Sequence, residues 1–249
     1  MSVSLVWNSL HSSRSARTLS LALGALACLA TRALPAQSVS PPIAEYQVRA
    51  RSSFQLINSG IFPLNVVLEV RGFRVTERGE VEDAQLDTAR VHVKLSAMSF
   101  RIPPRATYTV FYEATADSLP AWFNILSAMT GARTENGLNV RILLPHVVYL
   151  NQREALKKEQ VAIRRFELDS AAGKLRVQVE NLGPNLGRVQ QVTASAGKAS
   201  SPPSAGFPLF PHMTRWTEVD WPGPTSPERL TVRFARFSVD TLLSTASSP

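Results

Sequence analysis

A seven-residue pattern that occurs twice places the strongest constraint on how this chain folds. Residues 54–60 (FQLINSG) are matched much later by residues 177–183 (VQVENLG). Each copy alternates like a β-strand and ends in Asn-x-Gly, where asparagine and glycine tolerate the left-handed backbone of a tight turn. A second strand-like run follows each copy. The repeat therefore predicts two all-β domains of the same type in tandem.

Period-two alternation of apolar and polar residues recurs along the rest of the chain from residue 44 onward. Apolar members of such runs are Leu64, Val66 and Leu68, then Val91, Val93 and Leu95, and later Leu230, Val232 and Phe234. Turn signals rich in glycine, proline or asparagine separate the runs. Several short strands at this spacing indicate β-sandwiches in which each sheet buries one face.

The first 36 residues have the features of an export signal. Arg14 and Arg17 precede an apolar run over residues 19–30, and no acidic residue occurs before Glu45. A run of this length is typical of a signal-peptide core and falls short of the roughly 20 residues that span a bilayer. We therefore expect residues 1–36 to be a signal peptide cut after Ala36, and no stable membrane insertion afterwards. An uncleaved membrane anchor is the alternative.

Cysteine use and charge exclude several classes of function. Cys28 is the only cysteine and lies within the predicted signal, so the mature chain has no thiol for disulfides, metal ligation or nucleophilic catalysis. The net charge of +8 includes three arginines of the signal, and removing them leaves +5. The remaining basic residues are scattered, whereas nucleic-acid binding needs a clustered basic face. We therefore expect no nucleic-acid partner.

Motifs for catalysis or cofactor binding are absent from the sequence. There is no glycine-rich phosphate loop, no dinucleotide fingerprint and no Gly-x-Ser-x-Gly nucleophile motif. The four histidines are isolated, with no His-x-x-x-His or His-Glu pairing. We predict a protein that is not an enzyme and has no catalytic residues, no cofactor and no metal. A hydrolase assembled from distant residues is the alternative.

A polar segment at residues 151–160 (NQREALKKEQ) separates two strand-rich regions. Domain boundaries fall in polar segments that few contacts cross. We place the boundary there, which predicts an N-terminal domain over residues 37–152 and a C-terminal domain over residues 153–249. About 100 residues in each is enough for one hydrophobic core.

One predicted strand differs from the others in length and character. Residues 138–150 (LNVRILLPHVVYL) exceed the usual strand length of about 5–6 residues and are apolar on both faces over much of their length. Such a strand is either central or at an edge that receives a partner, and Pro145 favours an edge because proline cannot donate to a ladder. Val140, Ile142 and Leu144 would then fill pockets in another chain. Alternatively, these three pack in their own domain's core.

Several motifs, in order along the chain, resemble those of the periplasmic pilus-assembly chaperones, which have two immunoglobulin-like domains. They are residues 39–41 (VSP), 53–60 (SFQLINSG), 99–104 (SFRIPP), 122–124 (WFN) and 147–149 (VVY). The resemblance covers roughly the whole mature chain and is stronger in its first half. It implies an all-β fold of two tandem immunoglobulin-like β-sandwich domains, the first of which is the chaperone domain.

In that family, the last strand of the first domain completes the sandwich of a pilin subunit that lacks its own last strand. The resemblance implies a periplasmic chaperone that binds and stabilises pilus or fimbrial subunits by donor-strand complementation. Its partners would be pilin-like subunits, with an outer-membrane usher as a further candidate. Val140, Ile142 and Leu144 would be the subunit-binding residues, and a register shifted by one would select Leu143.

The chain departs from the family where the subunit's terminal carboxylate is anchored. The family uses an arginine near the mature start and a lysine in the final strand. Here the first position falls near residues 43–44, which carry no charge, and the second falls at His146, a poorer cation at neutral pH. His146, Arg49 and Arg51 are the candidates for a carboxylate contact, which makes this a divergent member. A structural role for His146 is the alternative.

A rival function is compatible with the same fold. An exported two-domain immunoglobulin-like module could bind envelope glycans or proteins through its loops and not through an edge strand. Aromatic residues such as Trp122, Trp216 and Trp221 would then carry the binding, and the edge strand would tolerate a charge.

Overall fold

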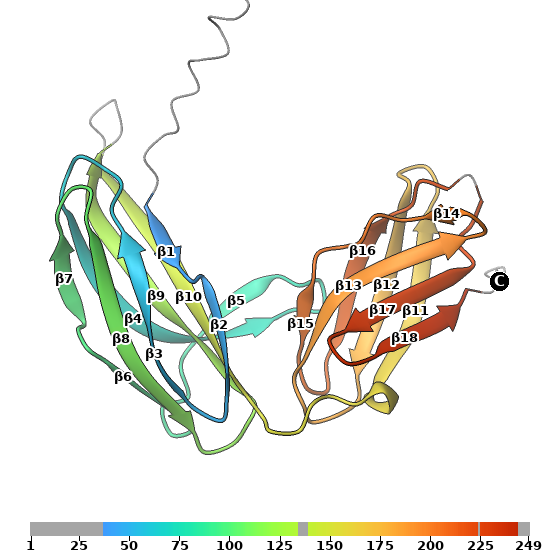
Figure 1. The fold of residues 1–249 in the computed structure, drawn as a ribbon, viewed down its shortest axis with the longest axis horizontal. Helices are drawn as coiled ribbons and strands as arrows, with labels where there is room; N and C mark the ends of the chain where they lie inside the picture. The colour runs from blue at the N-terminus through green and yellow to red at the C-terminus, as the bar shows by residue number, and fades with distance from the viewer. Residues whose placement is uncertain (1–36, 134–138, 224, 244–249) are drawn as a thin grey trace, which may run out of the picture. The chain divides into compact units, whose positions relative to one another are not determined.

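The computed structural model describes residues 37–133, 139–223 and 225–243, in which nearly all regular structure is β-strand. The chain forms two tandem immunoglobulin-like β-sandwiches, as the sequence predicts (Figure 1). The predicted signal peptide, residues 1–36, lies outside the described residues. Within the described part of the chain, no helix has the length and apolarity needed to span a bilayer.

Ten of the described strands form the first sandwich. One sheet has the order β1-β3-β8-β6, and the other has the order β2-β10-β9-β4-β5 with β7 paired to β4. The strands are β1 (Ser38–Ser40), β2 (Ile43–Gln47), β3 (Ala50–Ile57), β4 (Leu64–Val75), β5 (Val81–Ala84), β6 (Val91–Leu95), β7 (Ser99–Ile102), β8 (Thr107–Ala116), β9 (Ala121–Arg133) and β10 (Asn139–Asn151). The first two strands lie in different sheets, because β1 pairs with β3 whereas β2 pairs with β10.

Burial in the first sandwich follows the alternation in the sequence. In β4, Leu64, Val66 and Leu68 are each 1% exposed, whereas Asn65 and Val67 between them face solvent. The inward side chains of both sheets form one core cluster. Each fully buried side chain of this size contributes about 1.5–3 kcal/mol relative to an exposed one. This alternation therefore fixes which face of each sheet is inside.

The second sandwich has a three-stranded sheet and a five-stranded sheet. Their orders are β11-β12-β16 and β14-β13-β17-β18, and β15 pairs with β13. The strands are β11 (Val161–Asp169), β12 (Lys174–Asn181), β13 (Gly187–Ala196), β14 (Ala199–Ser200), β15 (Phe207–Leu209), β16 (Thr214–Asp220), β17 (Arg229–Phe234) and β18 (Ser238–Leu242). A single 3₁₀ turn, η1 (Lys158–Gln160), precedes β11. The boundary placed between residues 152 and 153 falls in the segment between β10 and β11 and stays a prediction.

The first copy of the repeated motif ends in a fully buried asparagine. The Nδ2 group of Asn58 donates to the carbonyl oxygens of Phe62 at 2.9 Å, Pro103 at 2.9 Å and Ile102 at 3.3 Å. Its Oδ1 atom accepts the backbone N–H of Gly60 at 3.0 Å. The side chain thus closes its own turn and ties that turn to the end of β7.

The second copy of the motif uses the same device. The Nδ2 group of Asn181 donates to the carbonyl oxygens of Asn185 at 2.7 Å and Leu209 at 3.3 Å, and its Oδ1 atom accepts the N–H of Gly183 at 2.9 Å. Like Asn58, Asn181 is fully buried. The sequence repeat therefore marks the same structural element in each sandwich, a strand whose terminal asparagine fastens a neighbouring strand end.

A third apolar cluster draws on both sandwiches. Phe73 and Tyr149 from the first sandwich pack with Leu186 and Phe210 from the second. The ring of Trp122 lies 4.6 Å from that of Phe210, measured between centroids. The proline-rich segment that contains Phe210 is therefore used for packing at this junction.

Candidate functional site

The long strand β10 is paired along its whole length on one side but only over its second half on the other. It pairs with β9 antiparallel from Asn139 to Leu150, and with β2 parallel from Val147 to Asn151 (Figure 1). Residues 139–146 have no strand on their second side within the described part of the chain. We call this stretch the free edge of β10. A free edge leaves backbone N–H and C=O groups available to another chain.

The apolar side chains of the free edge differ in exposure. Val140 is 36% exposed, and Leu143, on the opposite face of the strand, is 50% exposed. Ile142 and Leu144 are half-buried and pack against the core of the first sandwich. These two side chains therefore contribute to the core of their own domain while they lie on an open edge, and their contact with another chain stays a prediction.

A glycine sets the register of the hairpin that presents this edge. The pairing of β9 with β10 shifts between Val140, opposite Ala132, and Ile142, opposite Met129, so β9 has one extra residue there. Gly131 has a φ of +97°, and a Cβ atom on it would lie 2.8 Å from the carbonyl oxygen of Pro63. Only glycine suits such a backbone conformation and such a close approach. We infer that this bulge defines which β10 side chains face inward.

The other long edges carry more charge than the free edge of β10. The edge strands β11 and β16 carry Arg164, Arg165, Glu167, Asp169, Arg215, Glu218 and Asp220. By contrast, Arg141 is the only Arg, Lys, Asp or Glu between residues 139 and 146. Charged residues on an edge strand oppose pairing with another chain. The free edge of β10 is therefore the long edge best suited to receive a strand.

His146, at the end of the free edge, is fully buried and has partners for both ring nitrogens. Its Nδ1 atom lies 2.7 Å from the carbonyl oxygen of Pro41, and its Nε2 atom lies 3.0 Å from the Tyr112 hydroxyl. Because a carbonyl only accepts, Nδ1 carries the hydrogen, and Nε2 of the neutral ring accepts from Tyr112. The ring also stacks on Phe54, with 4.5 Å between centroids.

The hydrogen-bonded chain extends from His146 across the sandwich. The Tyr112 hydroxyl on β8 lies 3.1 Å from the Tyr46 hydroxyl on β2. Burial raises the pKa of Tyr112, and the hydrogen bond to Tyr46 acts in the same direction. Burial lowers the pKa of His146 below its ordinary value of 6.5, although the hydrogen bond to Pro41 opposes this. A neutral histidine therefore joins β10 to β8 and to the segment that leads into β2.

We expect the lowered pKa of His146 to make stability depend on pH. The folded protein resists protonation of this ring, so the unfolded chain binds the proton at a higher pH than the folded protein does. The contribution of the neutral ring to the free energy of unfolding is therefore complete above about pH 6.5 and is lost as the pH falls below that value. The slope from one proton is at most about 1.4 kcal/mol per pH unit. Urea unfolding of the unmodified protein and of His146→Gln between pH 7.5 and 5 measures it. Equal slopes in the two proteins would contradict this role.

The structure does not bring together the three residues predicted to contact a carboxylate. His146 is inside the sandwich, whereas Arg51 lies on its outer surface and pairs with Glu113 at 3.2 Å. Arg49 is exposed in the turn between β2 and β3. The carboxylate contact stays a prediction, and burial with two internal partners makes His146 its least accessible member.

The three tryptophans of the rival prediction are not exposed. Trp221 is 5% exposed and belongs to the core of the second sandwich. Trp122 is half-buried, and its Nε1 group donates to the carbonyl oxygen of Phe73 at 3.0 Å. Trp216 is half-buried beneath the guanidinium of Arg176, 5.0 Å from the ring centroid. Each tryptophan therefore has a structural role.

No metal site is evident in the described residues, because no group of three His, Cys, Asp or Glu side chains lies close enough to hold an ion. Sequence reasoning missed the buried chain of Tyr46, Tyr112 and His146. Tyr46 and Tyr112 are 66 positions apart, and Tyr112 and His146 are 34 positions apart, so no local sequence spacing connects them. The pairing of β2 with β10 and the packing of their sheet on the sheet that contains β8 bring them together.

Solved structures provide the comparison for this geometry. No protein-family model matches the chain, and no curated protein matches its sequence. A structure described as a chaperone–tip adhesin complex of CFA/I fimbriae biogenesis has a TM-score of 0.50 and 6% identity, over 83% of this chain and 98% of that chain. The Salmonella enterica SafA pilin in complex with the SafB chaperone gives 0.49 and 13% identity, over 84% and 97%. The class 5 fimbriae chaperone CfaA gives 0.48 and 6% identity, over 83% and 98%.

The first of these comparisons supports the fold alone. The first one aligns over both sandwiches of this chain, since it covers most of the described residues. The chain therefore has the fold of the fimbrial chaperones, and the resemblance predicted from the sequence motifs is confirmed at that level. The function of the free edge is a separate question, because identities this low carry no information about binding residues.

Proposed function

We propose that this protein is a periplasmic chaperone that binds and stabilises pilus or fimbrial subunits by donor-strand complementation, without catalytic activity. Residues 1–36 direct export and are removed, residues 37–152 form the chaperone domain, and residues 153–249 form the second domain. Pilin-like subunits are its clients. An outer-membrane usher is a further candidate partner, which would receive the subunit from the chaperone.

The observation that carries this proposal is the free edge of β10. Over residues 139–146 it combines unpaired backbone on one side with apolar side chains and one charge. A strand of the client pairs with this backbone, and each net hydrogen bond contributes about 0.5–1.5 kcal/mol. Val140, Ile142 and Leu144 contact the client's incomplete core. Val140 is the most accessible of these three and gains most from burial.

A carboxylate of the client would have different partners from those usual in the family. The ring nitrogens of His146 are engaged by Pro41 and Tyr112. Of the three candidates, Arg49 and Arg51 remain on the surface, so a charged contact on this domain would fall to them. Binding would then depend more on the strand and less on a terminal anchor.

Capture of clients from the cell tests the proposal. The protein, expressed with its own signal and a C-terminal tag, is purified from envelope extracts, and the co-purified proteins are identified by mass spectrometry. We expect small, β-rich exported proteins that are absent from a mock purification. Recovery of no exported protein under conditions where the tagged protein is folded would contradict the proposal.

A further inference from the structure

An exposed aromatic ring lies on the outer face of the sheet β1-β3-β8-β6. Phe111 on β8 is 61% exposed, the highest value for a phenylalanine among the described residues. Its neighbours on the two flanking strands are small. It pairs with Ser53 on β3, and its carbonyl oxygen accepts the N–H of Ser96, just after β6, at 2.9 Å. A single exposed apolar residue is common on protein surfaces, so any role for this ring depends on what surrounds it.

A row of three charged residues crosses the same face beside this ring. Glu113 lies two residues after Phe111 on β8 and pairs with Arg51 on β3 and with Lys94 on β6. Residues two apart on a strand share a face, so this row lies next to the ring. The Nε atom of Arg51 is 3.2 Å from Oε1 of Glu113. No carboxylate in the described ranges forms an ion pair with Lys94, which leaves the row with one uncompensated positive charge.

The ring and the charged row line one hollow of about 530 Å³. Ser53 and Ser96 belong to the same lining, and their small side chains leave both edges of the ring uncovered. The strand β8 is paired with β3 on one side and with β6 on the other (Figure 1), so its backbone has no free edge for another strand. Recognition on this face is therefore left to side chains, which offer one aromatic face, hydroxyl groups and charges of both signs.

A sugar ring has the chemistry that matches this set of side chains. Its C–H groups form an apolar face with slight positive charge, which is attracted to the negative face of an aromatic ring. Its hydroxyl groups both donate and accept hydrogen bonds, so they suit a lining in which Lys94 donates, Glu113 accepts and Ser53 does both. The uncompensated charge of Lys94 further favours a carboxylate on the sugar.

We propose that this face binds oligosaccharides whose sugar rings carry carboxylates. One ring stacks on Phe111, its carboxylate accepts from Lys94, and its hydroxyl groups bond to Ser53 and Glu113. An anionic bilayer suits the face less well, because the carboxylate of Glu113 lies in the same lining. The free edge of β10 belongs to the other sheet of this sandwich, so this proposal goes beyond the proposed function and stands or falls separately from it.

Ligand-observed NMR on the purified protein, with trigalacturonate as the probe, tests the ligand class. We expect saturation transfer with a dissociation constant on the order of 1 mM, as suits a shallow site. The methyl ester of trigalacturonate keeps the sugar rings without the charge and is expected to bind at least about threefold more weakly. Glutarate keeps the charge without a ring and is expected to bind at least about tenfold more weakly. Equal binding of the ester or of glutarate, or no binding of trigalacturonate, would overturn the proposal.

Two pairs of matched variants locate the site. Phe111→Thr is expected to weaken trigalacturonate binding at least about fivefold, whereas Phe166→Thr, at an exposed phenylalanine of β11, is expected to leave it within about twofold. Lys94→Gln should bring the affinities for the acid and its methyl ester within about twofold of each other, and Lys198→Gln, at an exposed lysine of the second sandwich, should preserve the difference. Equal effects within either pair would overturn the site.

All four side chains are exposed, so we expect each variant to fold, and circular dichroism checks this. Sedimentation with phosphatidylglycerol vesicles tests the lipid alternative on the same proteins. We expect the unmodified protein to stay in the supernatant at 0.15 M salt. Vesicle binding that Phe111→Thr abolishes would identify this face as a membrane contact and overturn the proposal.

Discussion

The Asn58→Asp substitution is expected to lower the free energy of unfolding by about 3–5 kcal/mol. The new carboxylate would lie opposite the carbonyl oxygens of Phe62, Ile102 and Pro103, which now accept from the Asn58 amide. It would also be fully buried without a cation. Because folded domains are stable by only about 5–15 kcal/mol, the first sandwich should be largely unfolded or unfold at much lower denaturant. Urea unfolding followed by tryptophan fluorescence measures the change.

Two further substitutions make this experiment specific. Asn65→Asp is the same chemical change on β4 at an exposed position, and we expect it to alter stability by about 0.5 kcal/mol or less. Asn181→Asp should also destabilise the second sandwich strongly, because Asn181 is fully buried and its amide donates to two carbonyl oxygens where that of Asn58 donates to three. If Asn58→Asp were no more disruptive than Asn65→Asp, the structural role of the repeat would be wrong.

Val140→Asp is expected to reduce the recovery of client subunits at least about tenfold while leaving the protein folded. In the proposed complex this side chain enters the client's apolar groove, where a carboxylate without a partner is costly to bury. In the free protein it is already 36% exposed, so the charge remains hydrated. Recovery is measured by affinity capture from envelope extracts, and folding is checked by circular dichroism. Ile142 is a poorer choice because it packs against its own core.

Leu143→Asp is the matched control for this prediction. Leu143 is 50% exposed and lies on the opposite face of the same strand, so the substitution adds the same charge to the same edge. We expect near-normal capture, because the client's groove faces the side of β10 that carries Val140. The reverse result, capture lost with Leu143→Asp and retained with Val140→Asp, would show that the inserted register is shifted by one residue.

The strands could be predicted from the sequence because burial in a sandwich alternates residue by residue. Leu64, Val66 and Leu68 are buried in β4, as their alternation indicates. The long strand predicted over residues 138–150 is observed as Asn139–Asn151. The edge position of residues 139–146 could also be predicted, since Pro145 favours an edge, whereas the second half of the strand is paired on both sides.

The environment of His146 could not be predicted in this way. Its burial depends on the parallel pairing of β2 with the second half of β10, which begins opposite Val147. That pairing joins residues about 100 positions apart, and local periodicity carries no information about it. The sequence led us to consider His146 as a carboxylate contact, whereas the fold gives both of its nitrogens internal partners.

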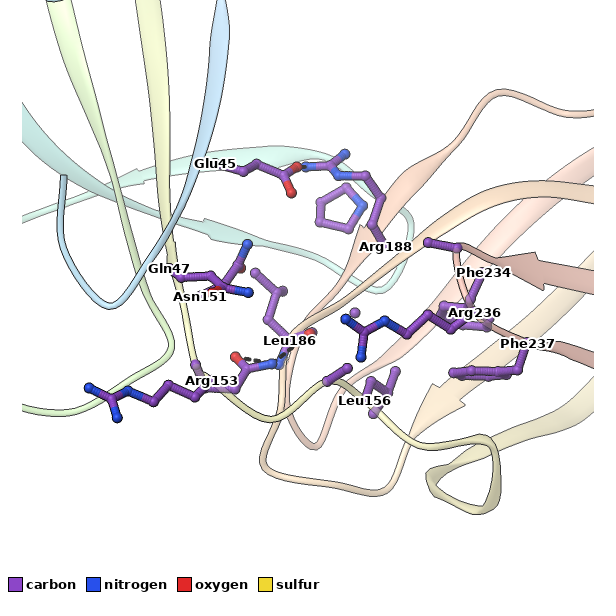
Figure 2. A pocket seen from close by; sticks show the side chains of 15 residues that line it. Glu45, Gln47, Asn151, Arg153, Leu156, Leu186, Arg188, Phe234, Arg236 and Phe237 are labelled. Carbon is purple, nitrogen blue, oxygen red and sulfur yellow. Dashed lines mark hydrogen bonds and ion pairs between the residues drawn. The ribbon is translucent and has the colours of Figure 1, made fainter. Parts of the chain in front are cut away.

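The pocket lined by Glu45, Arg153, Arg188 and Arg236 (Figure 2) was also beyond sequence reasoning. These charged residues come from β2, the segment that follows β10, β13 and the turn between β17 and β18. None of them belongs to a motif, and their meeting depends on loop positions that propensities do not determine. The repeat, in contrast, was informative because Asn58 and Asn181 act within short turns, where sequence and geometry are closely linked.

Amide hydrogen exchange on the purified chaperone–client complex tests the central claim most directly. In the free protein, we expect backbone amides on the open side of residues 139–146 to exchange rapidly, since no strand covers them. Client binding should slow their exchange at least about tenfold, while peptides from β11, the charged edge of the second sandwich, should change little. Unchanged exchange over residues 139–146 in a saturated complex would show that the client binds elsewhere and would contradict strand addition.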